Sequence, residues 1–340
     1  GYIASIVPMI ILPYYCVIGG WVLKYGVLYA QGSVSEAAND NFFSSFIGHT
    51  TSPLIFFLLY LGLTALIVIG GVEKSIEKMS KILMPILIVI TVGISIYVVC
   101  QPGALDGVKY YLLPDFSKFS FTTVCAAMGQ MFYSLSLAMG IMMTYSSYLP
   151  KKTDINNSAF MTAFANCGFE FLCAIGVFGI LGFMASSQGL PFEEVVSGGI
   201  GLAFIVFPKV FGLMGVWGTI LGVLFFTCLV FAGLTSSVSL VEAVSSAVID
   251  KTGWERKKVV SLICGVGFIV SIAFATRAGL YLLDIIDNFV NNYGIVVIGL
   301  LEAFVIGWII KPQTIRNHTN SVSYYRIGKW WDIIIKYVTP

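Results

Sequence analysis

Charged residues are scarce in this 340-residue chain. Asp, Glu, Lys and Arg together make up 11% of it, whereas hydrophobic residues make up 58% and the mean hydropathy is +0.91. Soluble globular domains carry roughly 25% charged residues, so this composition excludes a soluble domain. The net charge of +2 is too small to indicate nucleic-acid binding. The sequence therefore predicts an all-α polytopic membrane protein.

Histidine is also rare, and the cysteines form no motif. The only histidines, His49 and His318, fall in expected loops, and the seven cysteines include no CxxC pair. This pattern argues against a zinc site and a disulfide framework. No GxSxG, HExxH or Walker motif is present, so we expect neither an enzyme nor an organic cofactor.

The chain has no signal peptide of the usual kind. It begins at Gly1, and it ends at Pro340 only about half a membrane thickness into its last apolar segment. These ends predict a fragment that is cut at both sides.

Apolar runs long enough to cross a bilayer divide the chain, residues 1–340, into one transmembrane domain. A spanning helix needs about 20 mostly apolar residues. This criterion predicts nine spans, at 3–30, 53–72, 82–100, 119–149, 158–184, 216–248, 259–275, 280–291 and 295–310, and a partial tenth from Tyr324 onward. Two longer loops look partly ordered, 31–52 and 188–208, and the second resembles a re-entrant or lid-like hairpin.

The positive charges predict the orientation, because Lys and Arg accumulate on the cytoplasmic side. The loops after the second, fourth and sixth spans carry nine of them: Lys74, Lys78, Lys81, Lys151, Lys152, Lys251, Arg256, Lys257 and Lys258. The first span then runs from inside to outside. One loop violates the rule, since alternation places Lys311, Arg316, Arg326 and Lys329 outside.

A polar interruption lies inside the fourth span, GQMFYSLSLAMGIMMTYSSYL, residues 129–149. Ser134, Ser136 and Gly140 fall within seven residues, and unwound chain at this depth is tolerated only when it is buried in protein or lines a wet cavity. Alternatively the helix is continuous, with its serines bonded to the preceding turn and Gly140 used for packing. Residue types alone favour the continuous helix.

Other polar groups also lie at membrane depth. Asn166 and Glu170 are four residues apart and share one helix face, where a carboxylate is a candidate functional group. The run from Gly233 to Ser239 offers oxygen ligands that suit Na⁺ and disfavour zinc or iron, although helix packing alone also explains it. Asp284 and Asp287 form either a gate or a solvated helix start.

Four segments together carry a family resemblance. They are PYYCVIGGW (13–21), the 129–149 stretch, FANCGFE (164–170) and FAGLTSSVSL (231–240). In their order and spacing they resemble the neurotransmitter:sodium symporter family, the LeuT-like amino acid carriers of bacteria. The resemblance implies a fold of twelve helices in two inverted repeats. It places this chain from the third helix to the start of the twelfth, without the first two, and breaks the family's sixth helix near 134–140.

The resemblance also implies roles for individual residues. Substrate contacts are expected from Ile11, Tyr15, Tyr133, Ser136, Met139, Ser236 and Leu240. A first Na⁺ site is expected at Ser134 and Asn166, and a second at Ala232, Thr235 and Ser236. Glu170 occupies the position where chloride-independent members carry a carboxylate, and Asp287 fits the acidic half of an outer gate.

The function implied is sodium-coupled symport of a neutral, hydrophobic amino acid by alternating access. The carrier would be chloride-independent and lie in the inner (plasma) membrane of a bacterium. Two other hypotheses stay open: a channel or non-transporting receptor on the same fold, and a truncated, inert fragment. The sequence does not define the oligomeric state.

Overall fold

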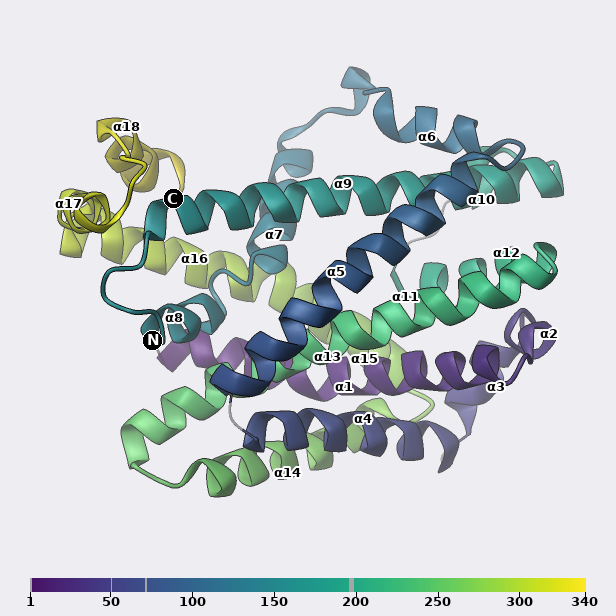
Figure 1. Cartoon of the computed structure of the whole chain (residues 1–340), viewed down its shortest axis with the longest axis horizontal. Helices are drawn as coiled ribbons and strands as arrows, with labels where there is room; N and C mark the ends of the chain where they lie inside the picture. Colours follow the sequence, from purple (N-terminus) through teal and green to yellow (C-terminus); the bar gives the residue numbers. More distant parts are fainter. Residues whose placement is uncertain (1, 50, 71, 196–198) are drawn as a thin grey trace.

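The computed structural model describes residues 2–49, 51–70, 72–195 and 199–340, and every regular element in these ranges is helical (Figure 1). The α-helices are α1 (Tyr2–Ala30), α2 (Val34–Ala37), α3 (Phe42–Gly48), α4 (Thr51–Ile69), α5 (Val72–Val99), α6 (Ala104–Leu112), α7 (Phe121–Ser134), α8 (Ile141–Ser147), α9 (Ile155–Gln188), α10 (Phe192–Val195), α11 (Gly199–Gly201), α12 (Phe207–Leu213), α13 (Val216–Thr252), α14 (Arg256–Phe274), α15 (Gly279–Phe289), α16 (Ile295–Phe304), α17 (Pro312–Val322) and α18 (Lys329–Ile333). Within these ranges, six uninterrupted helical stretches are long and apolar enough to cross a membrane, and the count is seven if α5 and α6, which meet at an angle of 113°, are taken as one broken span. The prediction of an all-α polytopic membrane protein is confirmed.

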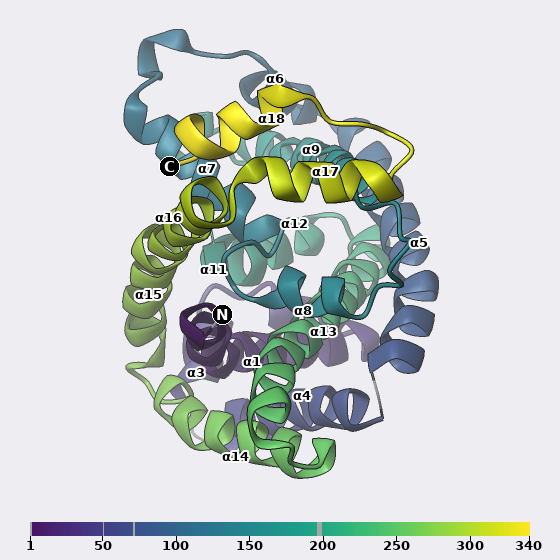
Figure 2. The same cartoon turned by 90° about the vertical axis from the view of Figure 1, so that its left-hand side faces the viewer.

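Helix α1 lies in the centre of the molecule and is surrounded by other helices (Figure 2). It packs against α4, α13 and α14, and its Cys16, Val17 and Tyr25 are fully buried. Gly20 permits the close contact with α4, because a Cβ atom there would lie 2.6 Å from the backbone nitrogen of Phe57. Small residues at such crossings let membrane helices approach closely, which compensates for the weak hydrophobic drive between helices in lipid.

The prediction of two separate spans at 280–291 and 295–310 is wrong. Helices α15 and α16 join through a π-helical turn, Val290–Gly294, and continue into a second, Val305–Ile310, so that 279–310 is one helical stretch of 32 residues. Asn291, Asn292 and Gly294 resemble a loop in the sequence. Here Asn292 Nδ2 instead donates to Asn288 Oδ1 at 2.5 Å within the helix. The predicted count of spans falls by one, and the last segment takes the family's eleventh position, not the twelfth.

This correction removes the exception to the charge rule. With one span fewer, the loop that carries Lys311, Arg316, Arg326 and Lys329 lies on the same side as the other lysine-rich loops. Figure 1 shows α17 and α18 at the same end of the molecule as α8 and the start of α9, opposite to α2, α3, α10 and α12. We call these two ends the inner and the outer end.

Hydrogen bonds hold the segment after α17 against the start of α9. Asn156 Nδ2 donates to Asn320 Oδ1 at 3.0 Å and to the Tyr325 carbonyl at 2.9 Å, while the Asn156 N–H donates to Ser323 Oγ at 3.0 Å. The Tyr324 N–H donates to Asp154, which also caps α9. Desolvation of the Asp154 carboxylate acts to raise its pKa, but the hydrogen bonds that it accepts from the Tyr324 and Asn157 N–H groups lower the pKa overall. We call residues 320–327 with 154–156 the inner clasp.

A buried ion pair joins three more helices at the inner end. The Glu242 side chain of α13 is fully buried and pairs with the guanidinium of Arg256 at the start of α14. Arg256 Nη1 lies 3.1 Å from Glu242 Oε1, and its Nε donates to the Val68 carbonyl of α4 at 2.9 Å. Tyr148, which follows α8, donates to the same carboxylate at 2.6 Å. The carboxylate is thereby compensated in a setting where an isolated charge is costly.

The two outer loops are partly helical. The first contains α2 and α3, and the second contains α10, α11 and α12. Of the glycine-rich centre of the second loop, Ser197 and Gly198 lie outside the described residues. Phe204 and Phe211 are buried, and Phe204 contacts the rings of Trp21 and Tyr25 in α1. The second loop therefore packs onto the helix core at the outer end.

Candidate functional site

The helix that carries the polar interruption is broken. Helix α7 ends at Ser134 and α8 begins at Ile141. The Leu137 N–H bonds to the Phe132 carbonyl and the Ser136 N–H to the Tyr133 carbonyl, the pair of bonds that closes a helix end. The continuous helix that residue types alone favour is therefore not formed.

The backbone of the break is strained. Ser136 and Ala138 have φ of 55° and 60°, and Gly140 has φ of 72°. Left-handed geometry costs a residue with a Cβ atom roughly 1–2 kcal/mol, and such strain concentrates at ligand sites. Only Gly140 adopts this geometry without that cost, which explains a glycine where α8 starts.

A cavity of about 380 Å³ lies beside the break, between α1, α7, α8 and α13. All seven residues expected to contact substrate line it. The full lining is Ile11, Tyr15, Gln130, Tyr133, Ser134, Ser136, Met139, Ile141, Thr235, Ser236, Ser239 and Leu240. None of these twelve residues is Asp, Glu, Lys, Arg or His. The cavity thus offers hydroxyl groups and apolar side chains, but no ionised side chain.

Three of the lining residues have no role in the sequence-based assignment, although Ser239 belongs to the polar run 233–239 noted there. Gln130 lies one helical turn before Ser134, Ile141 is the first residue of α8, and Ser239 follows the predicted Ser236 by three positions. Ser239 Oγ lies 2.5 Å from the hydroxyl oxygen of Tyr145, which joins α13 to α8. Helical periodicity from Ser134 would have identified Gln130, and the same periodicity from Ser236 would have assigned Ser239 to the cavity.

The first predicted sodium pair forms a polar cluster with Glu170. Ser134 Oγ lies 3.0 Å from Asn166 Oδ1 and 2.7 Å from Asn166 Nδ2, and it also contacts the Glu170 carboxylate. Asn166 Nδ2 donates to Glu170 Oε1 at 3.1 Å. Since Ser134 also lines the cavity, α9 contributes a carboxylate and an amide directly behind the cavity wall. These are oxygen ligands that hard cations prefer.

The second predicted sodium set is only partly brought together. Thr235 Oγ1 donates to the Ala232 carbonyl at 2.9 Å, so these two oxygens are adjacent. Thr235 and Ser236 line the central cavity. Ala232 lines a separate apolar cavity of about 160 Å³ between α5, α9 and α13. Ala232 and Thr235 thus line different cavities, although their oxygens are hydrogen-bonded to each other.

Asp287 lies outside the central cavity. Its Oδ1 accepts a hydrogen bond of 2.8 Å from the Tyr14 hydroxyl, and Tyr14 is buried in α1 next to Tyr15 of the cavity. The two adjacent tyrosines of α1 thus make different contacts. Tyr15 lines the cavity, and Tyr14 donates a hydrogen bond to the Asp287 carboxylate of α15.

A discontinuous membrane helix whose unwound segment lines a polar cavity is the architecture of secondary transporters. The chain belongs to the sodium:neurotransmitter symporter family, whose sequence profile matches residues 43–340. An uncharacterized sodium-dependent transporter of Methanocaldococcus jannaschii is 38% identical over 100% of this chain and 71% of its own length. The sodium- and chloride-dependent taurine transporter of Rattus norvegicus is 29% identical over 70% of this chain and 40% of its own length.

Solved structures agree with this assignment. The crystal structure of MhsT in complex with L-phenylalanine superimposes with a TM-score of 0.87 at 30% identity, over 100% of this chain and 78% of that one. The LeuT-like fold is confirmed. The protein is a sodium-dependent transporter, a multi-pass membrane protein and not an enzyme.

Proposed function

We propose that the protein is a symporter that couples the entry of Na⁺ to the uptake of neutral, hydrophobic amino acids without a need for chloride. The observation that carries this proposal is the central cavity, whose lining combines hydroxyl groups with apolar side chains and contains no ionised residue. An amino acid with a charged side chain would lose its hydration there without gaining an ion pair. MhsT, the structural neighbour at 30% identity, was crystallised with L-phenylalanine.

The polar part of the cavity suits the backbone groups of an amino acid. Tyr15 would donate its hydroxyl hydrogen to the substrate carboxylate, and Ser136 and Ser236 would complete the polar contacts. Ile11, Met139 and Leu240 would surround the apolar side chain, and all three are buried.

Tyr133 would close over the bound substrate from the outer side. Met139 is an unbranched thioether that adapts its shape to different ligands. The pocket should therefore accept aromatic as well as aliphatic amino acids.

Sodium would bind on both sides of the break. Ser134 and Asn166 supply oxygens 3.0 Å apart beside the expected position of the substrate carboxylate, which would itself attract the cation. The second ion would take the Ala232 carbonyl and the hydroxyls of Thr235 and Ser236. Because the first ion and the substrate would share one site, each raises the affinity of the other, and this reciprocity is the basis of coupling.

Glu170 supports chloride independence. Its carboxylate contacts Ser134 and Asn166, so a fixed negative charge already lies beside the first cation position. A chloride ion bound at this position would be repelled by the Glu170 carboxylate, because both carry a negative charge.

Asp287 would form the acidic part of an outer gate, held in place by Tyr14. In the resulting cycle, Na⁺ stabilises the outward-open form, the substrate binds, Tyr133 closes, and the inner end then opens.

Uptake of radiolabelled L-phenylalanine by the full-length protein in proteoliposomes tests the proposal. An inward Na⁺ gradient should drive accumulation of L-phenylalanine. Replacing Na⁺ by choline should abolish this accumulation, and replacing chloride by gluconate should leave it unchanged. Met139→Phe should narrow the range of transported amino acids by lowering uptake of Trp relative to uptake of Leu. Substrate affinity independent of Na⁺ would refute coupling. Flux far above carrier turnover would indicate a channel, and binding without flux a receptor.

A further inference from the structure

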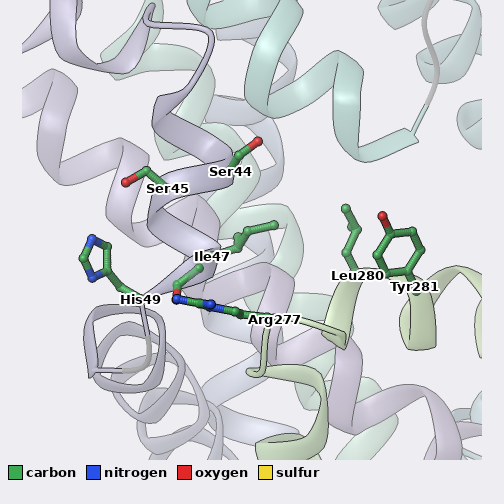
Figure 3. A pocket seen from close by; sticks show the side chains of 8 residues that line it. Ser44, Ser45, Ile47, His49, Arg277, Leu280 and Tyr281 are labelled. Carbon is green, nitrogen blue, oxygen red and sulfur yellow. The ribbon is translucent and has the colours of Figure 1, made fainter.

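A second cavity, of about 560 Å³, opens at the outer end of the molecule, away from the central one (Figure 3). One wall is the C-terminal part of α3 with His49, and the other is Arg277 and the start of α15. The lining is Ser44, Ser45, Ile47, Gly48, His49, Arg277, Leu280 and Tyr281. Neither the substrate contacts nor the sodium ligands proposed above belong to it.

The charge of this outer cavity is positive. Arg277 is its one permanently charged residue, and no Asp or Glu lines it. Arg277 Nε donates to the Gly48 carbonyl at 3.3 Å, and Figure 3 shows the guanidinium extending from the turn before α15 toward α3. Arg277 is exposed, and within the described ranges no carboxylate pairs with it, so its charge is not neutralised by these residues. Serine hydroxyls and the His49 imidazole add further donors.

The cavity lies where lipid headgroups are expected. α4 begins at Thr51, α14 ends at Phe274 and α15 begins at Gly279, so three membrane helices start or end beside it. Below it, along α15 and the π-helical turn that follows, every fourth residue is a large apolar side chain directed away from the protein. Tyr281, Ile285, Phe289 and Tyr293 are 73%, 56%, 64% and 63% exposed and share one helix face. This acyl-chain stripe continues directly from the cavity, since Tyr281 belongs to both.

We propose that the outer cavity binds the headgroup of an anionic phospholipid, such as phosphatidylglycerol, and that its acyl chains lie along the stripe. The planar guanidinium of Arg277 matches two phosphate oxygens. Ser44 and Ser45 point to opposite sides of α3 in Figure 3, so one of their hydroxyls would donate to the glycerol headgroup. A zwitterionic lipid would bring a quaternary ammonium into a site that has a cation and no carboxylate. The apolar stripe favours a lipid over a soluble anion, because a free phosphate gains nothing from it.

Lipid titration of the purified full-length protein in detergent, followed by native mass spectrometry, tests this. We expect phosphatidylglycerol to bind at least about tenfold more tightly than phosphatidylcholine with the same chains. Arg277→Gln should reduce phosphatidylglycerol binding about fivefold, as expected for one basic residue near an anionic headgroup. Lys109→Gln removes an exposed outer charge elsewhere and should change nothing.

Three outcomes would overturn the proposal: equal binding of both lipids, unchanged binding in Arg277→Gln, or an equal loss in Lys109→Gln. Competition by millimolar inorganic phosphate as effective as that by the lipid would assign the cavity to a soluble anion instead. If Arg277→Gln is not monodisperse in gel filtration, His49→Phe replaces it. That variant removes the imidazole donor and keeps an aromatic ring, without touching the contact between Arg277 and the Gly48 carbonyl. Unaltered lipid preference in His49→Phe would also overturn the proposal.

Discussion

The buried ion pair between Glu242 and Arg256 is a sensitive point of the inner end. Replacing Arg256 by Met removes the Nη contacts to the carboxylate and the Nε bond to the Val68 carbonyl. The fully buried Glu242 then keeps only the hydroxyl of Tyr148. We expect Arg256→Met to destabilise the protein.

The magnitude follows from the burial of the two partners. Breaking a buried pair by removing one partner costs about 3–5 kcal/mol. The Arg256 side chain is 29% exposed, so water can partly solvate the remaining carboxylate and the lower end of that range applies. A loss of about 3 kcal/mol corresponds to a fall of roughly 6–12 °C in Tm, given about 2–4 °C per kcal/mol for mid-sized domains.

The assay is a thermal denaturation series on the detergent-solubilised full-length protein, read as loss of the monodisperse gel-filtration peak. Lys257→Met is the matched control, because it removes an exposed charge from the next position and should shift Tm by less than about 1 °C. The double variant Glu242→Leu with Arg256→Met replaces both charges by apolar groups and should recover most of the loss. A double variant as unstable as Arg256→Met, or a single variant with unchanged Tm, would refute the reasoning.

Two further predictions concern the sodium cluster and the helix core. Glu170→Ser removes the fixed charge beside Ser134 and should make uptake depend on chloride, measured as at least a tenfold loss in gluconate; uptake equal in both anions would contradict this role. Gly20→Val should lower Tm by roughly 5 °C or more, because its Cβ would lie 2.6 Å from the Phe57 backbone. Gly62→Val, with open space around the added Cβ, is the control for that effect, and equal losses would disprove the packing argument.

The membrane class and most helices follow from the sequence because long apolar runs have few alternatives in a bilayer. The error at 280–310 has a physical cause. Asn291, Asn292 and Gly294 are loop-forming in water, but inside a membrane bundle their backbone stays bonded in a π-helical turn. A residue count cannot distinguish a true loop from a widened helical turn.

Motif resemblance placed the cavity residues better than residue types did. Ser134 and Ser136 alone favoured an unbroken helix, since serine can bond back within a helix, and only the left-handed backbone at Ser136 and Ala138 identifies the break. Glu242 shows the opposite case. A carboxylate inside an apolar helix was a usable signal, but its partner Arg256 follows fourteen residues later, beyond the end of the helix, where only the fold brings the two together.

The inner clasp has a mechanical consequence. Asn156 lies in the first turn of the helix that also carries Asn166 and Glu170, the polar groups behind the central cavity. Any tilt that separates the inner end of this helix from residues 320–327 must break the Asn156 bonds together with the Asp154 contact. The segment after α17 therefore restrains movement of the inner end of α9. Either it moves with α9 as one rigid piece, or its release sets part of the energy needed to open the inner end.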